Sequence, residues 1–179
     1  PAQFWAHKNH RYIIDAIKFL KKSGREDIKV IFTGHDKSNK EYIKKTIDDE
    51  SLNENFIILD YISDKELISL YLNCSALIMP TFVGHSTLPL YEAFYFKLPV
   101  FFTEGLLDDK LRDLVYEIDI YKPDNFINVL NKFENDISEK NQKITKAKNF
   151  YEKNCEKFKL FQNLSKIFEE FKYLSKRWM

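Results

Sequence analysis

The sequence has little glycine and cysteine, and it has no hydrophobic run long enough to cross a membrane. Four glycines and two cysteines occur among its 179 residues. Cys74 and Cys155 are too few for a disulfide framework, which points to a reducing compartment. No run of about 20 apolar residues occurs, and we expect no signal peptide. We therefore expect a cytoplasmic protein whose membrane contact, if it has one, is weak and peripheral, at the inner face.

The chain also lacks an excess of charge of either sign. Its 28 lysines and arginines nearly balance 27 aspartates and glutamates, which gives a net charge of +1. Since binding along a nucleic acid requires a broad cationic face, we do not expect nucleic acid as a partner. Residues 140–176 are rich in lysine but also contain glutamates and spaced aromatics. This pattern is more typical of a solvated amphipathic face than of a membrane or RNA patch.

The apolar residues are sufficient for one core and are arranged as alternating strands and helices. Hydrophobic residues make up 44% of the chain and aromatic residues 16%. Capping-box spacing at Ser38–Glu41 and at Ser63–Glu66 marks two helix starts, and helices are expected at about 125–178. The alternation predicts an α/β fold, a Rossmann-like parallel sheet flanked by helices, in a single domain over residues 1–179. The predicted strands are residues 29–34, 56–61, 76–81, 99–103 and a short edge strand at 118–121.

The segment Ala76–Val100 gathers polar groups at one corner of this predicted sheet. A buried strand is followed by a turn around Gly84, and a helix begins near Leu88 with Pro89 in its first turn. Ser86 or Thr87 can cap that helix. A helix start beside the carboxyl ends of parallel strands offers free N–H donors and partial positive charge. The segment therefore predicts a site for an anionic ligand.

The same segment resembles the donor-site signature in the C-terminal half of retaining GT-B glycosyltransferases of family 4. The resemblance rests on the order of strand, proline, turn, Leu88-Pro89, Glu92-Ala93-Phe94 and Pro99-Val100. Glu92 matches the second of two family glutamates, the one that binds the ribose hydroxyls of a nucleotide sugar. Gly84 stands where the first glutamate is usual, and Lys97 stands where a glycine usually ends the helix. A left-handed Lys97 would cost on the order of 1 kcal/mol.

The first residues resemble the family's phosphate-binding segment. Lys8 falls on the family's phosphate-binding lysine, and Gln3 replaces the usual arginine. Glutamine can donate hydrogen bonds but cannot neutralise a diphosphate, so Lys8 would carry more of the charge. By resemblance, Lys8 and Glu92 are the catalytic residues. The other expected ligand contacts are Gln3, Gly34, Tyr61, Ile62, Gly84, His85, Ser86, Thr87 and Leu88.

The resemblance implies a hexosyltransferase that moves a sugar from a nucleotide-diphosphate donor to an acceptor with retention. It implies a UDP- or GDP-sugar as donor, a glycan or lipid-linked acceptor, and a role in bacterial surface polysaccharide synthesis. No cofactor is expected. His7 and His10 are three positions apart, but no cysteine or carboxylate set completes a metal site, so no metal is predicted either.

The resemblance also implies that this chain is one half of a GT-B protein. The N-terminal domain, which receives the acceptor in that fold, has no counterpart here, so the chain alone is expected to be inactive. The family's first strand of this domain lies in mid-sheet and would end near Pro1. Without it, two rows of backbone groups would lack partners. We expect either a longer polypeptide or self-association that fills the gap.

Other interpretations remain open on the residues alone. A non-catalytic nucleotide- or sugar-binding module is favoured by Gln3 and Gly84, and a GT-B-type sugar-nucleotide epimerase would share the diphosphate corner. Lys8 could equally be a solvated lysine near a helix start. Glu92 could instead satisfy nearby N–H groups, His85 could be a neutral surface histidine, and Gly34 could serve only the turn after its strand.

Overall fold

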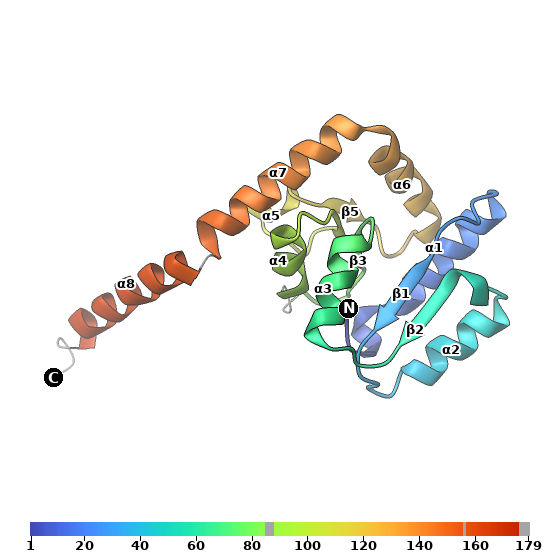
Figure 1. Cartoon of the computed structure of the whole chain (residues 1–179), viewed down its shortest axis with the longest axis horizontal. Coiled ribbons are helices and arrows are strands. Elements are labelled where there is room, and N and C mark those ends of the chain that lie inside the picture. The colour runs from blue at the N-terminus through green and yellow to red at the C-terminus, as the bar shows by residue number, and fades with distance from the viewer. Residues whose placement is uncertain (85–87, 156, 176–179) are drawn as a thin grey trace.

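The computed structural model describes residues 1–84, 88–155 and 157–175, so His85, Ser86 and Thr87 lie outside the described residues. Short strands alternate with helices along the chain (Figure 1). The strands are β1 Val30–Thr33, β2 Phe56–Leu59, β3 Leu77–Met79, β4 Val100–Thr103 and β5 Tyr116–Ile118. The α-helices are α1 His10–Lys22, α2 Lys40–Asp49, α3 Asp64–Asn73, α4 Leu88–Tyr95, α5 Asp109–Arg112, α6 Phe126–Asn135, α7 Ile137–Asn154 and α8 Lys157–Ser175. Short 3-10 helices span Ala6–Lys8, Asn53–Asn55 and Pro123–Asn125.

The strands form two parallel sheets. One pairs β1 with β2, and the other has the order β3-β4-β5. Helices cover these sheets, which confirms the predicted α/β class with parallel strands between helices. Within the described residues, β1 and β3 belong to different sheets. The separation falls where the family resemblance places an additional strand.

The N-terminal residues lie along the carboxyl end of β1. The Ala2 N–H donates to the Thr33 carbonyl at 2.9 Å, and the Phe4 N–H donates to the His35 carbonyl at 2.9 Å. Gly34 allows this close approach, because a Cβ at that position would lie 2.2 Å from the Ala2 carbonyl oxygen. This segment leads the chain from the edge of β1 to the start of α1.

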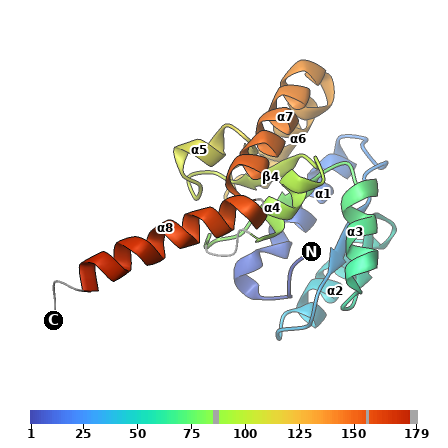
Figure 2. The ribbon, with the colours of Figure 1, turned by 60° about the vertical axis from the view of Figure 1, so that its left-hand side comes forward.

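Two hydrophobic clusters hold the helices on the sheets. Strand β4 serves both, since Phe101 packs in one cluster and Val100 and Phe102 pack in the other. The first cluster includes residues of α1, α2 and α6. The second includes residues of α3, α4, α5 and α7, and α4 lies against α7 (Figure 2). Burial on both faces explains why Val100, Phe101 and Phe102 of β4 are consecutive apolar residues rather than alternating ones.

One predicted helix cap is confirmed and the other is wrong. Ser63 and Glu66 form a capping box at α3, in which the Ser63 N–H donates to Glu66 Oε2 at 2.8 Å. Ser38 does not cap α2, because its own backbone is left-handed, with φ of 70°. Asp36 Oδ1 instead accepts from the N–H of Lys40 at 3.2 Å.

The last strand begins and ends earlier than predicted. We expected residues 118–121, whereas β5 spans Tyr116–Ile118. Tyr116 and Ile118 are buried in the core. The Asp119 carboxylate accepts the Tyr121 N–H at 2.9 Å, and this local turn ends the strand.

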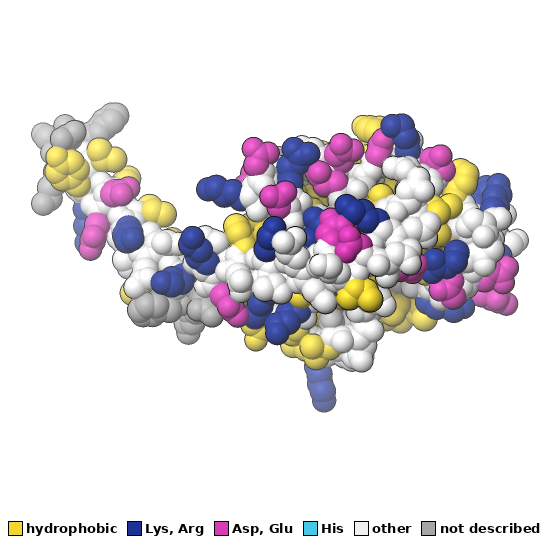
Figure 3. Space-filling view, turned by 90° about the horizontal axis from the view of Figure 1, so that it is seen from above, with side chains coloured by type: hydrophobic (Ala, Val, Ile, Leu, Met, Phe, Trp, Pro, Cys, Tyr) yellow, Lys and Arg dark blue, Asp and Glu magenta, His cyan; other side chains and the backbone are white. Residues whose placement is uncertain are grey.

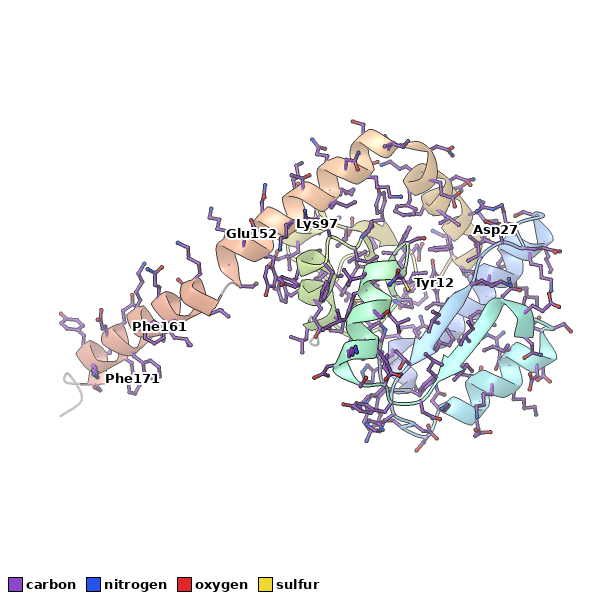
Figure 4. All side chains as sticks on the ribbon, viewed as in Figure 1. Tyr12, Asp27, Lys97, Glu152, Phe161 and Phe171 are labelled. Carbon is purple, nitrogen blue, oxygen red and sulfur yellow. The ribbon has the colours of Figure 1, made fainter. Side chains whose placement is uncertain are left out.

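Helix α8 follows α7 and extends away from the sheets and the other helices (Figure 1). The side chains of Phe161 and Phe171 project from this helix (Figure 4). No helix among the described residues is both long enough and apolar enough to pass through a bilayer. Charges of both signs are interspersed over the face shown in Figure 3. The exposed apolar and aromatic residues described on α8 are Leu160, Phe161, Leu164, Ile167, Phe168, Phe171, Tyr173 and Leu174.

The helix end at Lys97 generates a stability prediction. Lys97 has φ of 60°, and the Leu98 N–H donates back to the Ala93 carbonyl at 2.9 Å, so the left-handed backbone expected here is present. We expect Lys97→Gly to stabilise the protein by about 1 kcal/mol because glycine adopts this conformation without a Cβ penalty. Urea unfolding measures the change. Lys45→Gly, in the interior of α2, is the control and should destabilise; stabilisation by neither or by both substitutions would contradict the argument.

Candidate functional site

The site lies where the loop before α1 meets the loop after β3. The carbonyl oxygen of His7 accepts two hydrogen bonds, from the Phe82 N–H at 2.9 Å and from Thr81 Oγ1 at 3.1 Å. Thr103 Oγ1 at the end of β4 donates to the Thr81 carbonyl at 2.8 Å. These bonds fix the two loops to each other and to the sheet. They bring Lys8 close to the chain that leads into α4.

A cavity of about 920 Å³ opens at this junction and continues between the two sheets. Gln3, Lys8, Thr81 and Pro89 contribute to its lining, together with apolar residues of β1 and β3. The structure therefore brings Gln3 and Lys8 together with the first turn of α4, as the family resemblance implied. A polar end and an apolar interior are typical of small-molecule sites.

Lys8 is one of the cationic residues that line this cavity, together with Lys29. It is half-buried, and burial lowers the pKa of its ammonium group. Within residues 1–84, 88–155 and 157–175, its Nζ makes neither a hydrogen bond nor an ion pair. A partly desolvated ammonium without a counter-ion is a favourable position for an anionic ligand.

The start of α1 lies next to Lys8. Asn9 is left-handed, with φ of 54°, and its Oδ1 accepts the Tyr12 N–H at 3.4 Å. Burial, and then neighbouring positive charge that includes Lys8, lower the pKa of His10 to about 4. His10 is therefore neutral near pH 7 and adds no positive charge to the cavity.

Gln3 is exposed, and its side chain is oriented by a neighbour. Trp5 Nε1 donates to Gln3 Oε1 at 2.9 Å. Because the amide oxygen is the acceptor, the Gln3 amide NH₂ remains a donor. This is the donor that would replace part of the family arginine's function.

Glu92 lies in the second turn of α4 and is half-buried. Its Oε2 accepts a hydrogen bond of 2.7 Å from the hydroxyl of Tyr71 on α3. Tyr71 itself lines the cavity. Sequence reasoning placed Tyr71 only on the helix after Ser63 and missed this contact, because no local pattern indicates a partner 21 positions away.

The remaining predicted contact residues are more scattered. Tyr61 is 64% exposed and stacks on His35 with ring centroids 4.7 Å apart. Leu88 is exposed, whereas Ile62 and Gly84 are half-buried. A Cβ at Gly84 would meet nothing closer than 3.5 Å, so its backbone surroundings do not require glycine. None of these four residues lines the cavity that contains Lys8.

No group of three or more potential metal ligands occurs in the part of the chain that the structure describes. Residues 2–150 match a family model described as glycosyl transferases group 1. The chain belongs to the group 1 glycosyltransferase family. A comparison with curated protein sequences gives no match.

Solved structures show the same fold for this glycosyltransferase domain. WaaG, a glycosyltransferase involved in lipopolysaccharide biosynthesis, is 16% identical, with a TM-score of 0.65 over 82% of this chain and 40% of WaaG. Alr3699/HepE from Anabaena, in complex with UDP, is 13% identical, with a TM-score of 0.76 over 94% of this chain and 47% of that one. The C-terminal domain of the group 1 protein LpcC from Francisella tularensis is 16% identical, with a TM-score of 0.65 over 82% of this chain and 79% of that domain.

These likenesses establish a GT-B C-terminal domain. The chain spans less than half the length of WaaG and HepE but most of the LpcC C-terminal domain. Its fold is therefore that of one half of a GT-B glycosyltransferase.

The environment of Lys8 predicts an anion site that this glycosyltransferase domain provides without a nucleotide. We expect the chain to bind inorganic pyrophosphate, and Lys8→Ala to weaken that binding about tenfold, because a half-buried ammonium group of the cavity lining is removed. Calorimetric titration measures both affinities. Lys146→Ala, an exposed lysine on α7, is the control. Equal affinities for pyrophosphate in the chain and both variants would show that Lys8 does not bind the anion.

Proposed function

We propose that this domain binds a nucleotide-diphosphate sugar and supports transfer of the sugar, with retention, as a family 4 enzyme. The half-buried Lys8, which lines the same cavity as Pro89 at the start of α4, is the observation that carries the proposal. The two loops that hold these groups are joined through the His7 carbonyl. The site thus combines a cation with helix N–H donors, as a diphosphate requires.

The chemical help that these groups give is electrostatic. When the sugar leaves, negative charge develops on the diphosphate oxygens. Lys8 Nζ and the N–H groups in the first turn of α4 stabilise that charge. The Gln3 amide donates an additional neutral hydrogen bond, and Glu92 accepts the ribose hydroxyls. Together they orient the donor and lower the barrier to departure of the diphosphate.

The donor is a UDP- or GDP-sugar. The HepE structure of the same fold is a complex with UDP, and a second HepE structure holds UDP and glucose. The polar end of the cavity, where Lys8 and Pro89 lie, suits the diphosphate of such a donor, whereas its apolar part lies between β1 and β3.

A second candidate is a non-catalytic nucleotide- or sugar-binding module. The observation that favours it is the neutral Gln3, whose amide oxygen is occupied by Trp5. Gln3 cannot supply the second positive charge that would stabilise a departing diphosphate. Binding of a nucleotide sugar by the whole protein without product would support this candidate, whereas product analysis without an acceptor would reveal an epimerase.

For the whole protein we propose transfer to a glycan or lipid-linked acceptor in bacterial surface polysaccharide synthesis. WaaG, a structure of this fold, is described as acting in lipopolysaccharide biosynthesis. The acceptor would bind to the other half of the GT-B protein, so this chain alone turns over donor poorly. The exposed apolar residues and lysines of α8 suit a weak, peripheral contact at the inner face of the membrane.

We also propose that the space between β1 and β3 is filled by a strand, either from a longer polypeptide or by self-association. Light scattering on the 21.5 kDa chain should give the mass of an oligomer, because association covers the two unpaired strand edges. Hydrogen exchange should then be slow only in the oligomer at those amides of β1 and β3 that face the unpaired edges, because the others already face β2 and β4. A monomer in which both strands are fully protected would contradict this.

Nucleotide binding is the decisive measurement for the proposed function. We expect one of UDP, GDP and ADP to bind the chain more tightly than the others in calorimetric titrations. Glu92→Gln should weaken that nucleotide about tenfold but leave pyrophosphate unchanged, because it alters only the ribose contact. Lys8→Ala should weaken both ligands.

Glu169→Gln, on α8, is the matched control and should change neither affinity. Tight pyrophosphate binding with no preference for any nucleotide would reduce the site to a simple anion site. That outcome would contradict a nucleotide-sugar donor.

A further inference from the structure

Tyr71 and Glu92 form a contact that the proposed function leaves unexplained. The Tyr71 hydroxyl donates to Glu92 Oε2 at 2.7 Å, from α3 to α4. We propose that Tyr71 is a positioning residue, which holds the Glu92 carboxylate in the orientation that accepts the ribose hydroxyls. This inference rests on the proposed function, since it concerns the ribose end of the same nucleotide.

The Tyr71 ring is held firmly enough to act in this way. Its side chain is only 4% exposed, and it packs in the cluster that contains Leu77 and Phe94. Its ring stacks on Phe96 with centroids 5.4 Å apart and planes 12° apart. Burial, together with the Glu92 carboxylate, raises the pKa of Tyr71, so the hydroxyl stays protonated and remains a donor. A rigid ring therefore presents a fixed donor.

Glu92 needs such a partner because its own side chain is flexible. A half-buried glutamate on a helix has several accessible rotamers, and ordering them costs free energy when a ligand binds. One hydrogen bond to Oε2 selects a rotamer before the ligand arrives. Oε1 makes no hydrogen bond to any residue that the structure describes, so it remains free to accept.

The position of Tyr71 connects this carboxylate with the cavity. Tyr71 lines the cavity that also contains Lys8 and Pro89. Glu92 is one turn beyond Pro89 on the same helix. Glu92 is not among the residues that line the cavity, so Tyr71 is the member of the pair that reaches it. The proposal places the ribose of the bound nucleotide beside this pair.

The test compares ribonucleotides with their 2′-deoxy counterparts, because the ratio of the two affinities reports on contacts to the missing hydroxyl. The purified chain is titrated with UDP and 2′-deoxy-UDP and with GDP and 2′-deoxy-GDP. We expect the ribonucleotide that binds to be preferred about tenfold over its deoxy form, a typical effect of one hydrogen bond to a charged group. Tyr71→Phe should reduce that preference to about threefold or less while preserving the ring and its stacking.

Three variants make the comparison specific. Glu92→Gln should also reduce the preference, and the double variant with Tyr71→Phe should reduce it no further, because both substitutions act through one carboxylate. Tyr116→Phe is the matched control, since Tyr116 is likewise 4% exposed, lies on β5 outside the cavity, and has a buried hydroxyl without a partner within the described residues. It should keep the full preference.

The outcomes separate this proposal from the proposed function. If the chain prefers the ribonucleotide and Tyr71→Phe keeps the full preference, Tyr71 does not position Glu92, although the nucleotide site stands. If no nucleotide binds, both proposals fail. Equal binding of ribo- and deoxynucleotides also overturns the positioning role, because no ribose contact then exists for Tyr71 to support.

A loss of the preference in Tyr71→Phe supports the proposal only if the fold is intact. Pyrophosphate affinity serves as that check, because it depends on Lys8 rather than on Glu92. It should be the same in the chain and in Tyr71→Phe. A parallel loss of pyrophosphate affinity would indicate a general disturbance of the cavity and would overturn the specific positioning role.

Discussion

One carbonyl oxygen joins the two loops of the candidate site. The His7 carbonyl accepts from both Thr81 and Phe82, which joins segments 74 residues apart in the sequence. A shared hydrophobic cluster that contains residues of α1, β1 and β4 also holds the two sheets together. Because the sheets share no strand pairing within the described residues, the His7 junction and this cluster are what connect the two loops. The electrostatic argument for a diphosphate depends on this connection.

The sequence allowed the fold and the local motifs to be predicted, but not the contacts between elements. Strand and helix positions followed from hydrophobic periodicity, and the capping box at Ser63 and Glu66 followed from spacing along one segment. The predicted cap at Ser38 was wrong although Ser38 and Glu41 have the same spacing. The carboxylate of Asp36, which lies outside that spacing, accepts the Lys40 N–H at the start of the helix instead. The edge strand was misplaced because Asp119 forms a local turn that apolar patterning does not reveal.

The candidate site shows the same division. Lys8 and Glu92 stand in recognisable local patterns, so they could be proposed from sequence. The contacts of the His7 carbonyl could not be predicted, because a backbone group leaves no trace in the residue type. The hydrogen bond of the Tyr71 hydroxyl could not be predicted either, because the apolar pattern around Tyr71 indicates only a buried helix face. The need for glycine at position 34 cannot be read from the sequence. A Cβ there would lie 2.2 Å from the Ala2 backbone, and only the folded chain shows this close approach. Long-range hydrogen bonds and close backbone approaches are therefore what the structure adds.

Lys8 and Glu92 are prepared for a ligand in opposite ways. Lys8 is partly desolvated without a counter-ion, so an arriving anion restores the interaction that burial has weakened. Glu92 has one oxygen already bonded to Tyr71, so a ligand needs to engage only the other. The first arrangement contributes mainly to affinity, since any phosphate satisfies it, whereas a fixed carboxylate distinguishes ligands by their hydroxyl groups. In the proposed site a nucleoside diphosphate uses both, and affinity and selectivity should therefore respond to different substitutions.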